Sequence, residues 1–239
     1  MSQKCLAILL DIEGTTTPIE FVHITLFGYA RERMKYFIEK NIESRGTNEA
    51  LSELWKMMLS DVSSGEFTLR ETTVKGYGSE SLYQYVLWLM DKDSKAGPLK
   101  DIEGLIWQEG YRNGELRGEV YPDVPIALKK WSVEGKIVAI YSSGSELSQK
   151  LLFSTTEYGD LTIYINRFFD TKIGSKKDPM SYQRIAEEIA IKPGDVLFLS
   201  DSMDEIRAAS KAGLRSLLVS RDPKQASDGE SVVDFSAIC

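Results

Sequence analysis

A short stretch near the N-terminus most constrains what this chain can fold into. Residues 5–10 are apolar and typical of a buried strand, and they run directly into Asp11, Glu13 and Gly14. Because side chains alternate along an extended backbone, we expect Asp11 and Glu13 on the same side of it. Gly14 lets the backbone approach whatever these carboxylates hold. Two such charges repel unless a cation or a shared proton neutralises them, so this stretch is the first candidate for a functional site.

The pattern after Pro18 changes from strand to helix. Apolar residues recur at helical spacing, which predicts helices at about 19–42, 48–62, 79–90 and 99–113. Asn48 is expected to cap the second of these helices. Since almost no strand pattern interrupts this region, we expect residues 18–117 to form an α-helical cap domain inserted after the first strand.

The remainder of the chain alternates strands with helices. Strand-like runs occur at 136–141, 164–169, 196–199 and 216–219, separated by helical segments at 125–134, 146–153, 180–190 and a last one ending at 212. This alternation predicts the α/β class, with a parallel sheet and right-handed crossovers. We therefore expect a Rossmann-like core from residues 1–17 and 118–239. Ligands of such sheets bind at the carboxyl ends of the strands, where the insert begins, so the cap is expected to cover the site.

The charge balance limits the possible partners. The chain has 36 acidic and 29 basic residues, a formal net charge of −7, which argues against nucleic-acid binding because that relies on basic surfaces. No apolar run approaches the length of a membrane span, and the N-terminal run is too short for a signal peptide. We expect no membrane partner, and an acidic chain without an obvious exposed apolar helix fits a monomer.

Cysteine and histidine are scarce. The two cysteines are Cys5 and Cys239, which fits a reducing compartment and predicts a cytoplasmic location, or the nucleus as well in a eukaryote. His23 is the single histidine and is expected to be an ordinary helix residue. Zinc sites built from several histidines are therefore excluded, and carboxylate chemistry with a hard metal is favoured.

Four groups of polar residues follow successive strand-like runs. Each group alone has an ordinary explanation as a turn, a helix cap or a solvated loop. Four such coincidences at successive strand ends indicate a single site instead. The groups are Asp11 with Glu13, Ser142 with Ser143, Lys176, and Asp201 with Glu205.

These residue types fit phosphoryl transfer. Asp11 and Asp201 offer the oxygen ligands that Mg²⁺ prefers, leaving other positions for phosphate and water. Ser142 and Ser143 offer hydroxyl and backbone N–H groups at a helix N-terminus, where phosphate is readily bound. Lys176 would supply positive charge to the transferring group.

Several segments form recognisable motifs. They are Leu-Asp-Ile-Glu-Gly-Thr-Thr-Thr-Pro-Ile (10–19), Ile-Tyr-Ser-Ser-Gly-Ser (140–145), Gln-Lys-Leu-Leu-Phe (149–153), Phe-Asp-Thr-Lys-Ile-Gly (169–174) and Leu-Phe-Leu-Ser-Asp (197–201). They resemble the haloacid dehalogenase-like hydrolases and, more specifically, the enolase-phosphatase family of methionine salvage. The resemblance covers the core and the start of the insert, to about residue 27. Most superfamily phosphatases have Asp where this chain has Glu13, whereas Glu is typical of the enolase-phosphatases.

The resemblance implies an activity with two steps on one substrate. An acireductone synthase enolises 2,3-diketo-5-methylthiopentyl-1-phosphate, and then hydrolyses the phosphate through an aspartyl-phosphate. The product is the acireductone 1,2-dihydroxy-3-keto-5-methylthiopentene. A small phosphorylated diketone is thus the implied substrate, and one Mg²⁺ per subunit the implied cofactor.

The resemblance also implies residue roles. Asp11 would be the nucleophile, and Glu13 the general acid and base as well as the first candidate for the enolisation base. Lys176 would take part in catalysis and bind the phosphate. Mg²⁺ would be held by Asp11, Asp201 and the backbone carbonyl of Glu13. The substrate-binding residues would be Ser142, Ser143 and Lys176, with Glu205 as an outer partner of the metal.

Two other functions stay open. The first is a plain Mg²⁺-dependent phosphatase of small metabolites, which would release phosphate without forming an enediol. The second is a non-catalytic module that binds phosphorylated ligands, although the presence of Asp11, Lys176 and Asp201 speaks against it. Cap aromatics such as Phe21 and Trp88 could shield the methylthio tail, but a role in the core of the cap itself is the simpler expectation.

Overall fold

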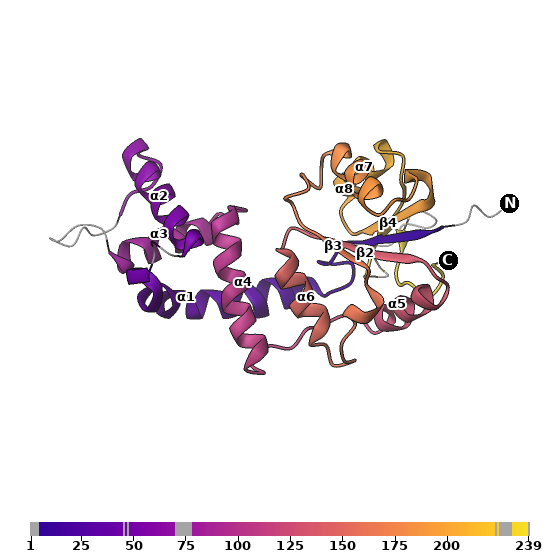
Figure 1. Cartoon of the computed structure of the whole chain (residues 1–239), viewed down its shortest axis with the longest axis horizontal. Helices are drawn as coiled ribbons and strands as arrows, with labels where there is room; N and C mark the ends of the chain where they lie inside the picture. The colour runs from indigo at the N-terminus through magenta and orange to yellow at the C-terminus, as the bar shows by residue number, and fades with distance from the viewer. Residues whose placement is uncertain are drawn as a thin grey trace. The chain divides into compact units, whose positions relative to one another are not determined.

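A computed structural model describes residues 5–44, 46, 48–69, 78–222, 224 and 231–238 (Figure 1). The chain divides into two compact units, Met1–Val22 with Arg117–Cys239 and, separately, His23–Leu116. The first unit contains the sheet, and in its described residues the second contains only helices and turns. Cys5 is buried and not in a disulfide, and Cys239 lies outside the described residues.

The sheet unit is built on six parallel strands in the order β3-β2-β1-β4-β5-β6. The strand in the middle is β1, whose four residues are fully buried, and it pairs with β2 on one side and β4 on the other. The predicted α/β class with a parallel sheet is therefore confirmed. The strands are β1 (Ala7–Leu10), β2 (Ile137–Tyr141), β3 (Arg167–Phe169), β4 (Val196–Ser200), β5 (Arg215–Val219) and β6 (Ser231–Val232).

Helices cover both faces of the sheet (Figure 1). One face packs against α7 and α8 through a core that includes Leu9, Ala139, Tyr182 and Phe198. On the other face, α5 contacts β2 and α6 contacts β3. The helices are α5 (Asp123–Val133), α6 (Glu146–Ser154), α7 (Pro179–Glu188) and α8 (Met203–Lys211), with short 3-10 turns at Thr162–Tyr164 and Pro193–Asp195.

The strand predicted at 164–169 is shorter than expected. A 3-10 turn occupies Thr162–Tyr164, and β3 begins only at Arg167. Asn166 explains the late start, because its backbone N–H donates to the Val138 carbonyl while its side-chain oxygen accepts the Val138 N–H at 2.9 Å. The side chain thus makes a bond that a strand backbone would otherwise make. The short strand β6 was not predicted.

The helical unit has its own core. A π-helical turn, Phe21–Leu26, leads into α1 (Phe27–Asn41), and a 3-10 turn, Ile42–Ser44, follows. Asn48 caps the next helix as predicted, accepting the Leu51 N–H at 3.1 Å. The aromatic rings of Phe27 and Trp88 contact Trp107 and Tyr85 of the same unit. The remaining helices are α2 (Glu49–Ser64), α3 (Ser79–Asp91) and α4 (Gly97–Arg112).

Within the described residues, no helix has the combination of length and apolar character that crossing a bilayer requires. His23 lies in the π-helical turn, where its ring is 5.8 Å from that of Phe27. It is therefore a helix residue, as expected.

A buried carboxyl group in α4 should make the stability of the helical unit depend on pH. Glu103 is only 4% exposed, and burial raises its pKa from 4.5 to about 8, against the opposing charges of Lys95 and Lys100. The folded chain thus holds this proton more tightly than the unfolded chain. The contribution of Glu103 to the free energy of unfolding is fully present below about pH 4.5 and is lost as the pH rises through about 8.

We expect Glu103→Gln to remove this pH-dependent loss of stability, because the amide does not ionise. Above pH 8 the variant should melt at a higher temperature than the parent, and thermal unfolding from pH 5 to 9 measures the difference. Glu109→Gln is the matched control, because Glu109 is exposed on the same helix, and it should leave the slope unchanged. Equal pH slopes for the parent and Glu103→Gln would contradict the assignment.

Candidate active site

The pairing of β1 with β4 brings the first candidate residues together. Leu10 is in register with Leu199, and the Asp11 N–H donates to the Leu199 carbonyl at 3.0 Å. Asp11 therefore follows β1 at the point where Ser200 ends β4. Its side chain is only 5% exposed, so its charge is largely withdrawn from water and requires partners.

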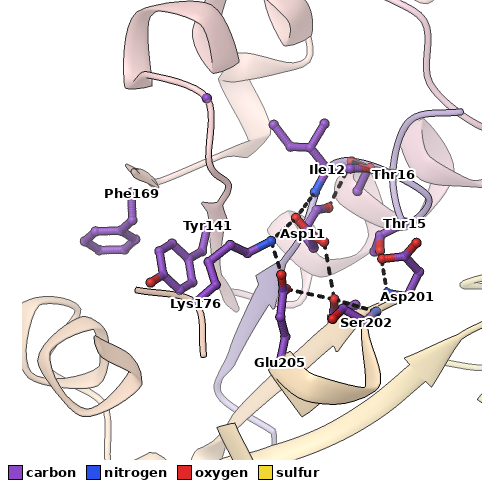
Figure 2. A network of polar contacts seen from close by, with 12 residues as sticks. Asp11, Ile12, Thr15, Thr16, Tyr141, Phe169, Lys176, Asp201, Ser202 and Glu205 are labelled. Atoms are coloured by element: carbon purple, nitrogen blue, oxygen red, sulfur yellow. Dashed lines mark hydrogen bonds and ion pairs between the residues drawn. The ribbon is translucent and has the colours of Figure 1, made fainter. Parts of the chain in front are cut away.

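Lys176 is the principal partner of Asp11 (Figure 2). Its ammonium nitrogen lies 2.6 Å from Asp11 Oδ1 and 2.8 Å from Glu205 Oε2. Burial alone would lower the pKa of Lys176, but the charges of Asp11 and Glu205 outweigh burial and raise it. The lysine is therefore held protonated between two carboxyl groups.

The loop that carries Lys176 is held by two tyrosine hydroxyls. The Tyr182 hydroxyl donates to the Lys176 carbonyl at 2.7 Å, and the Tyr141 hydroxyl donates to the Gly174 carbonyl at 2.9 Å. Gly174 has φ +144°, and a Cβ there would overlap Ser181 Oγ. The loop can therefore adopt this path only with glycine at that position.

A serine hydroxyl links the two carboxylates on the other side of the network. Ser200 Oγ is 3.2 Å from Asp11 Oδ2 and 3.0 Å from Glu205 Oε2, and its single proton can serve only one of them at a time. Burial, followed by the nearby charge of Asp11, raises the pKa of Glu205 to about 7, although Lys176 opposes the shift. Burial thus disfavours the negative charge of Glu205, and Lys176 supports it.

Asp201 completes the cluster from the end of β4. Its backbone N–H donates to Thr15 Oγ1 at 2.9 Å (Figure 2). Although the residue as a whole is exposed, its carboxyl group lies so close to Gly14 that a Cβ there would overlap Oδ2. Partial burial and the charge of Asp11 together raise the pKa of Asp201 to about 6. The charge of Asp11 therefore disfavours the ionisation of Asp201.

This donor set fits a hard divalent cation. The described residues contain no group of three or more His, Cys, Asp or Glu side chains arranged to hold a metal ion. Mg²⁺ needs no such group, because it commonly uses one or two carboxylates and takes the rest of its shell from phosphate and water. Asp11 and Asp201 offer that pair, and a cation between them would offset the repulsion that raises the pKa of Asp201.

The backbone at Glu13 is not the extended strand that the sequence expectation assumed. The Ile12 carbonyl accepts the N–H groups of Thr15, Thr16 and Thr17, so the backbone turns there and the alternation of an extended strand does not apply. Glu13 is half-buried, unlike Asp11. Its charge nevertheless contributes to the raised pKa of Asp201, which indicates that the two carboxylates lie near each other.

The serines after β2 also need a correction. The Ser142 N–H donates to the Phe169 carbonyl at 3.1 Å, so this donor is already used within the sheet. The helix α6 begins only at Glu146, with Ser145 as its cap. The expected cradle of backbone N–H groups at Ser142 and Ser143 is therefore wrong for Ser142. The hydroxyl groups of both serines remain candidates for phosphate binding.

One residue that supports this loop appeared in the sequence only as part of a motif, with no role predicted for it. Gln149 in α6 is 1% exposed, and its Nε2 donates to the carbonyls of Gly144 and Phe169, both at 2.8 Å. It thereby ties the loop after β2 to the end of β3. The available signal was a polar residue on the otherwise apolar face that includes Leu152 and Phe153.

Comparison with known proteins agrees with this geometry. A sequence profile of haloacid dehalogenase-like hydrolases matches residues 5–213. An enolase-phosphatase E1 of Persephonella marina is 44% identical over 215 residues, covering 90% of this chain and 88% of that protein. The chain belongs to the enolase-phosphatase E1 family. An enolase-phosphatase E1 of Drosophila pseudoobscura pseudoobscura is 39% identical, covering 97% and 93% of the two chains.

The fold agrees with the family assignment. The crystal structure of the UTR4 protein of Saccharomyces cerevisiae matches with a TM-score of 0.77 and 31% identity, covering 98% of this chain and all of that one. The resemblance drawn from the sequence motifs is therefore confirmed. Enolase-phosphatases and their superfamily generally use a divalent metal ion, which agrees with the oxygen donors of Asp11 and Asp201.

The Gln149 clamp gives a testable prediction for this enolase-phosphatase. In Gln149→Met the half-buried Gly144 carbonyl loses the donor that Gln149 supplies, whereas the Phe169 carbonyl keeps the Ser142 N–H, so we expect a loss of about 1–3 kcal/mol. Gln149→Glu should cost more at neutral pH, because a carboxylate would face the two carbonyls. Chemical denaturation of the parent and both variants measures the difference. A Glu variant as stable as the parent would show that the clamp contributes nothing.

Proposed function

We propose that this chain is an Mg²⁺-dependent acireductone synthase of methionine salvage. It would enolise 2,3-diketo-5-methylthiopentyl-1-phosphate and then hydrolyse the phosphate ester to give 1,2-dihydroxy-3-keto-5-methylthiopentene. The observation that carries the proposal is the buried Asp11 carboxylate, 2.6 Å from the Lys176 ammonium, in a chain that belongs to the enolase-phosphatase E1 family.

Asp11 is the proposed nucleophile. One of its carboxylate oxygens attacks phosphorus, the bond from phosphorus to the substrate oxygen breaks, and an aspartyl-phosphate forms. Water then attacks this phosphate and restores the carboxylate. Lys176 supports both steps, because its fixed positive charge lies beside the oxygens on which negative charge develops.

Mg²⁺ would be held by Asp11, Asp201 and the backbone carbonyl of Glu13. When bound, it would offset the repulsion between the nucleophile and the phosphate dianion. The hydroxyl of Ser142 and the ammonium of Lys176 would bind the phosphate oxygens, and Ser143 would lie nearer the rest of the substrate. A small phosphorylated substrate agrees with the family.

Glu13 is the proposed acid and base. It would donate a proton to the leaving oxygen and accept one from the attacking water. In the enolase step it is our candidate for removing the proton from the carbon beside a carbonyl group. Its side chain is one methylene longer than that of Asp, which extends its reach toward the carbon chain. We propose residues 18–117 as the cap that shields this chemistry from water.

A plain phosphatase is the alternative that the same core could support, because Asp11, Lys176 and Asp201 would serve any phosphomonoester. The two functions are separated by following phosphate release and the ultraviolet absorbance of the enediol together on the diketo phosphate. Coincident appearance of both signals supports the bifunctional enzyme. Phosphate without the absorbance would reduce the function to that of a phosphatase.

The nucleophile assignment predicts that Asp11→Asn abolishes phosphate release, because the amide cannot form the aspartyl-phosphate. The change keeps the size of a buried side chain, so the variant should fold, as circular dichroism and thermal unfolding would verify. Asp195→Asn is the control. It precedes β4 at the end opposite Asp201 and should retain activity. Turnover of Asp11→Asn near that of the parent would exclude Asp11 as the nucleophile.

Removal of the metal should stop dephosphorylation. We expect a chelator to abolish phosphate release and added Mg²⁺ to restore it, while Asp201→Asn should need more Mg²⁺ for half-maximal rate because one of two carboxylate ligands is lost. Steady-state rates across a magnesium titration measure both effects. Full activity in excess chelator would remove the metal from the mechanism.

A further inference from the structure

An arginine outside the cluster of Asp11, Lys176, Asp201 and Glu205 holds the turn that follows Asp11. Arg221 follows β5, and its side chain is 10% exposed. Its Nε and one terminal nitrogen donate to the Thr15 carbonyl at 2.9 Å and 2.5 Å. Thr15 lies in the turn directly after Asp11 and Glu13. A charged fork bonded twice to one backbone carbonyl fixes both its position and its direction.

The guanidinium is itself held rigidly. Its second terminal nitrogen lies 2.8 Å and 2.9 Å from the two carboxylate oxygens of Asp123. The guanidinium carbon is 4.3 Å from the ring centre of Tyr121 and 4.5 Å from that of Phe235. Asp123 also accepts the Phe235 N–H at 2.8 Å. Cation–π contacts and the ion pair together leave the guanidinium little freedom to move.

Thr15, whose carbonyl Arg221 holds, also lies close to the candidate metal ligands. Thr15 Oγ1 accepts the Asp201 N–H at 2.9 Å, and the neighbouring Thr16 Oγ1 lies 3.1 Å from the Asp11 carbonyl. Gly14, just before Thr15, packs so closely on the Asp201 carboxylate that no side chain fits. A shift of Thr15 would therefore change the separation of Asp11 and Asp201.

We infer that Arg221 is a positioning residue that sets the spacing of Asp11 and Asp201, and thereby the affinity of the site for a divalent cation. The inference rests on the proposed role of these two carboxylates as metal ligands. Arg221 bonds to the catalytic loop and to Asp123, so it acts through Thr15 rather than on the substrate.

If Arg221 only anchored the C-terminal residues 231–238, its loss should affect metal binding no more than the loss of another anchor of that segment. That segment has a separate attachment, because Lys130 Nζ donates to the Ile238 carbonyl at 2.9 Å. Lys130→Met therefore loosens the segment without touching Thr15, and it serves as the matched control for Arg221→Met. Both variants lose one cation that contacts the same part of the chain.

The test measures direct binding of Mn²⁺ alone to the full chain without substrate. The electron paramagnetic resonance signal of free Mn²⁺ reports binding, at a temperature well below the melting temperature of each variant. We expect Arg221→Met to bind about 10–100-fold more weakly, as for other residues that orient metal ligands. Arg221→Lys should fall between it and the parent, because an ammonium cannot reproduce the fork. Lys130→Met should bind like the parent.

Rate measurements then separate positioning from general damage. The metal concentration for half-maximal rate should rise in Arg221→Met, while kcat at saturating Mg²⁺ and the KM for substrate change much less. Unchanged Mn²⁺ affinity in Arg221→Met, or an equal loss in Lys130→Met, would overturn the inference. If Asp201→Asn also bound Mn²⁺ like the parent, the proposed metal site itself would be wrong, so the two failures are distinguishable.

Discussion

The structure of the site depends on one buried ion pair, between Lys176 and Asp11. Withdrawing a carboxylate and an ammonium from water costs several kcal/mol for each ion, and only good geometry with further hydrogen bonds offsets that cost. Here the offset comes from Glu205, which also binds the ammonium, and from the Ser200 hydroxyl beside both carboxylates. A buried carboxylate is thus kept in place next to a fixed positive charge, which is the arrangement that the proposed phosphoryl transfer requires.

The order of the strands makes this arrangement possible. Because β1 lies between β2 and β4, the residues that follow these three strands meet at one edge of the sheet. The turn after β1 is then held by Asp201 after β4 and Arg221 after β5. The turn that follows Asp11 is therefore positioned by residues after two other strands, so its geometry depends on how the strands pair.

Much of this was predictable because it depends on local patterns. Alternation of apolar runs and helical segments predicted the parallel sheet and most of the helices, and polar residues after successive strands predicted one shared site. Asp11, Lys176 and Asp201 do converge in the structure, since parallel strands place their carboxyl ends at one edge. The identity of Glu13 pointed to the family, because a motif is a property of the residues themselves.

The sequence alone determined the fold class and the family, and it singled out Asp11, Lys176, Asp201 and Glu205 of the central cluster, but it did not single out Ser200. Only the tertiary structure decided that the chain turns at Ile12, that the Ser142 N–H is already bonded to Phe169, and that Gln149 and Arg221 hold the loops. The turn at Ile12 rests on local hydrogen bonds from Thr15, Thr16 and Thr17, but the other features depend on hydrogen bonds between residues far apart in the chain. Periodicity reports which face of an element is buried, but it carries no information about which distant carbonyl a buried donor will meet.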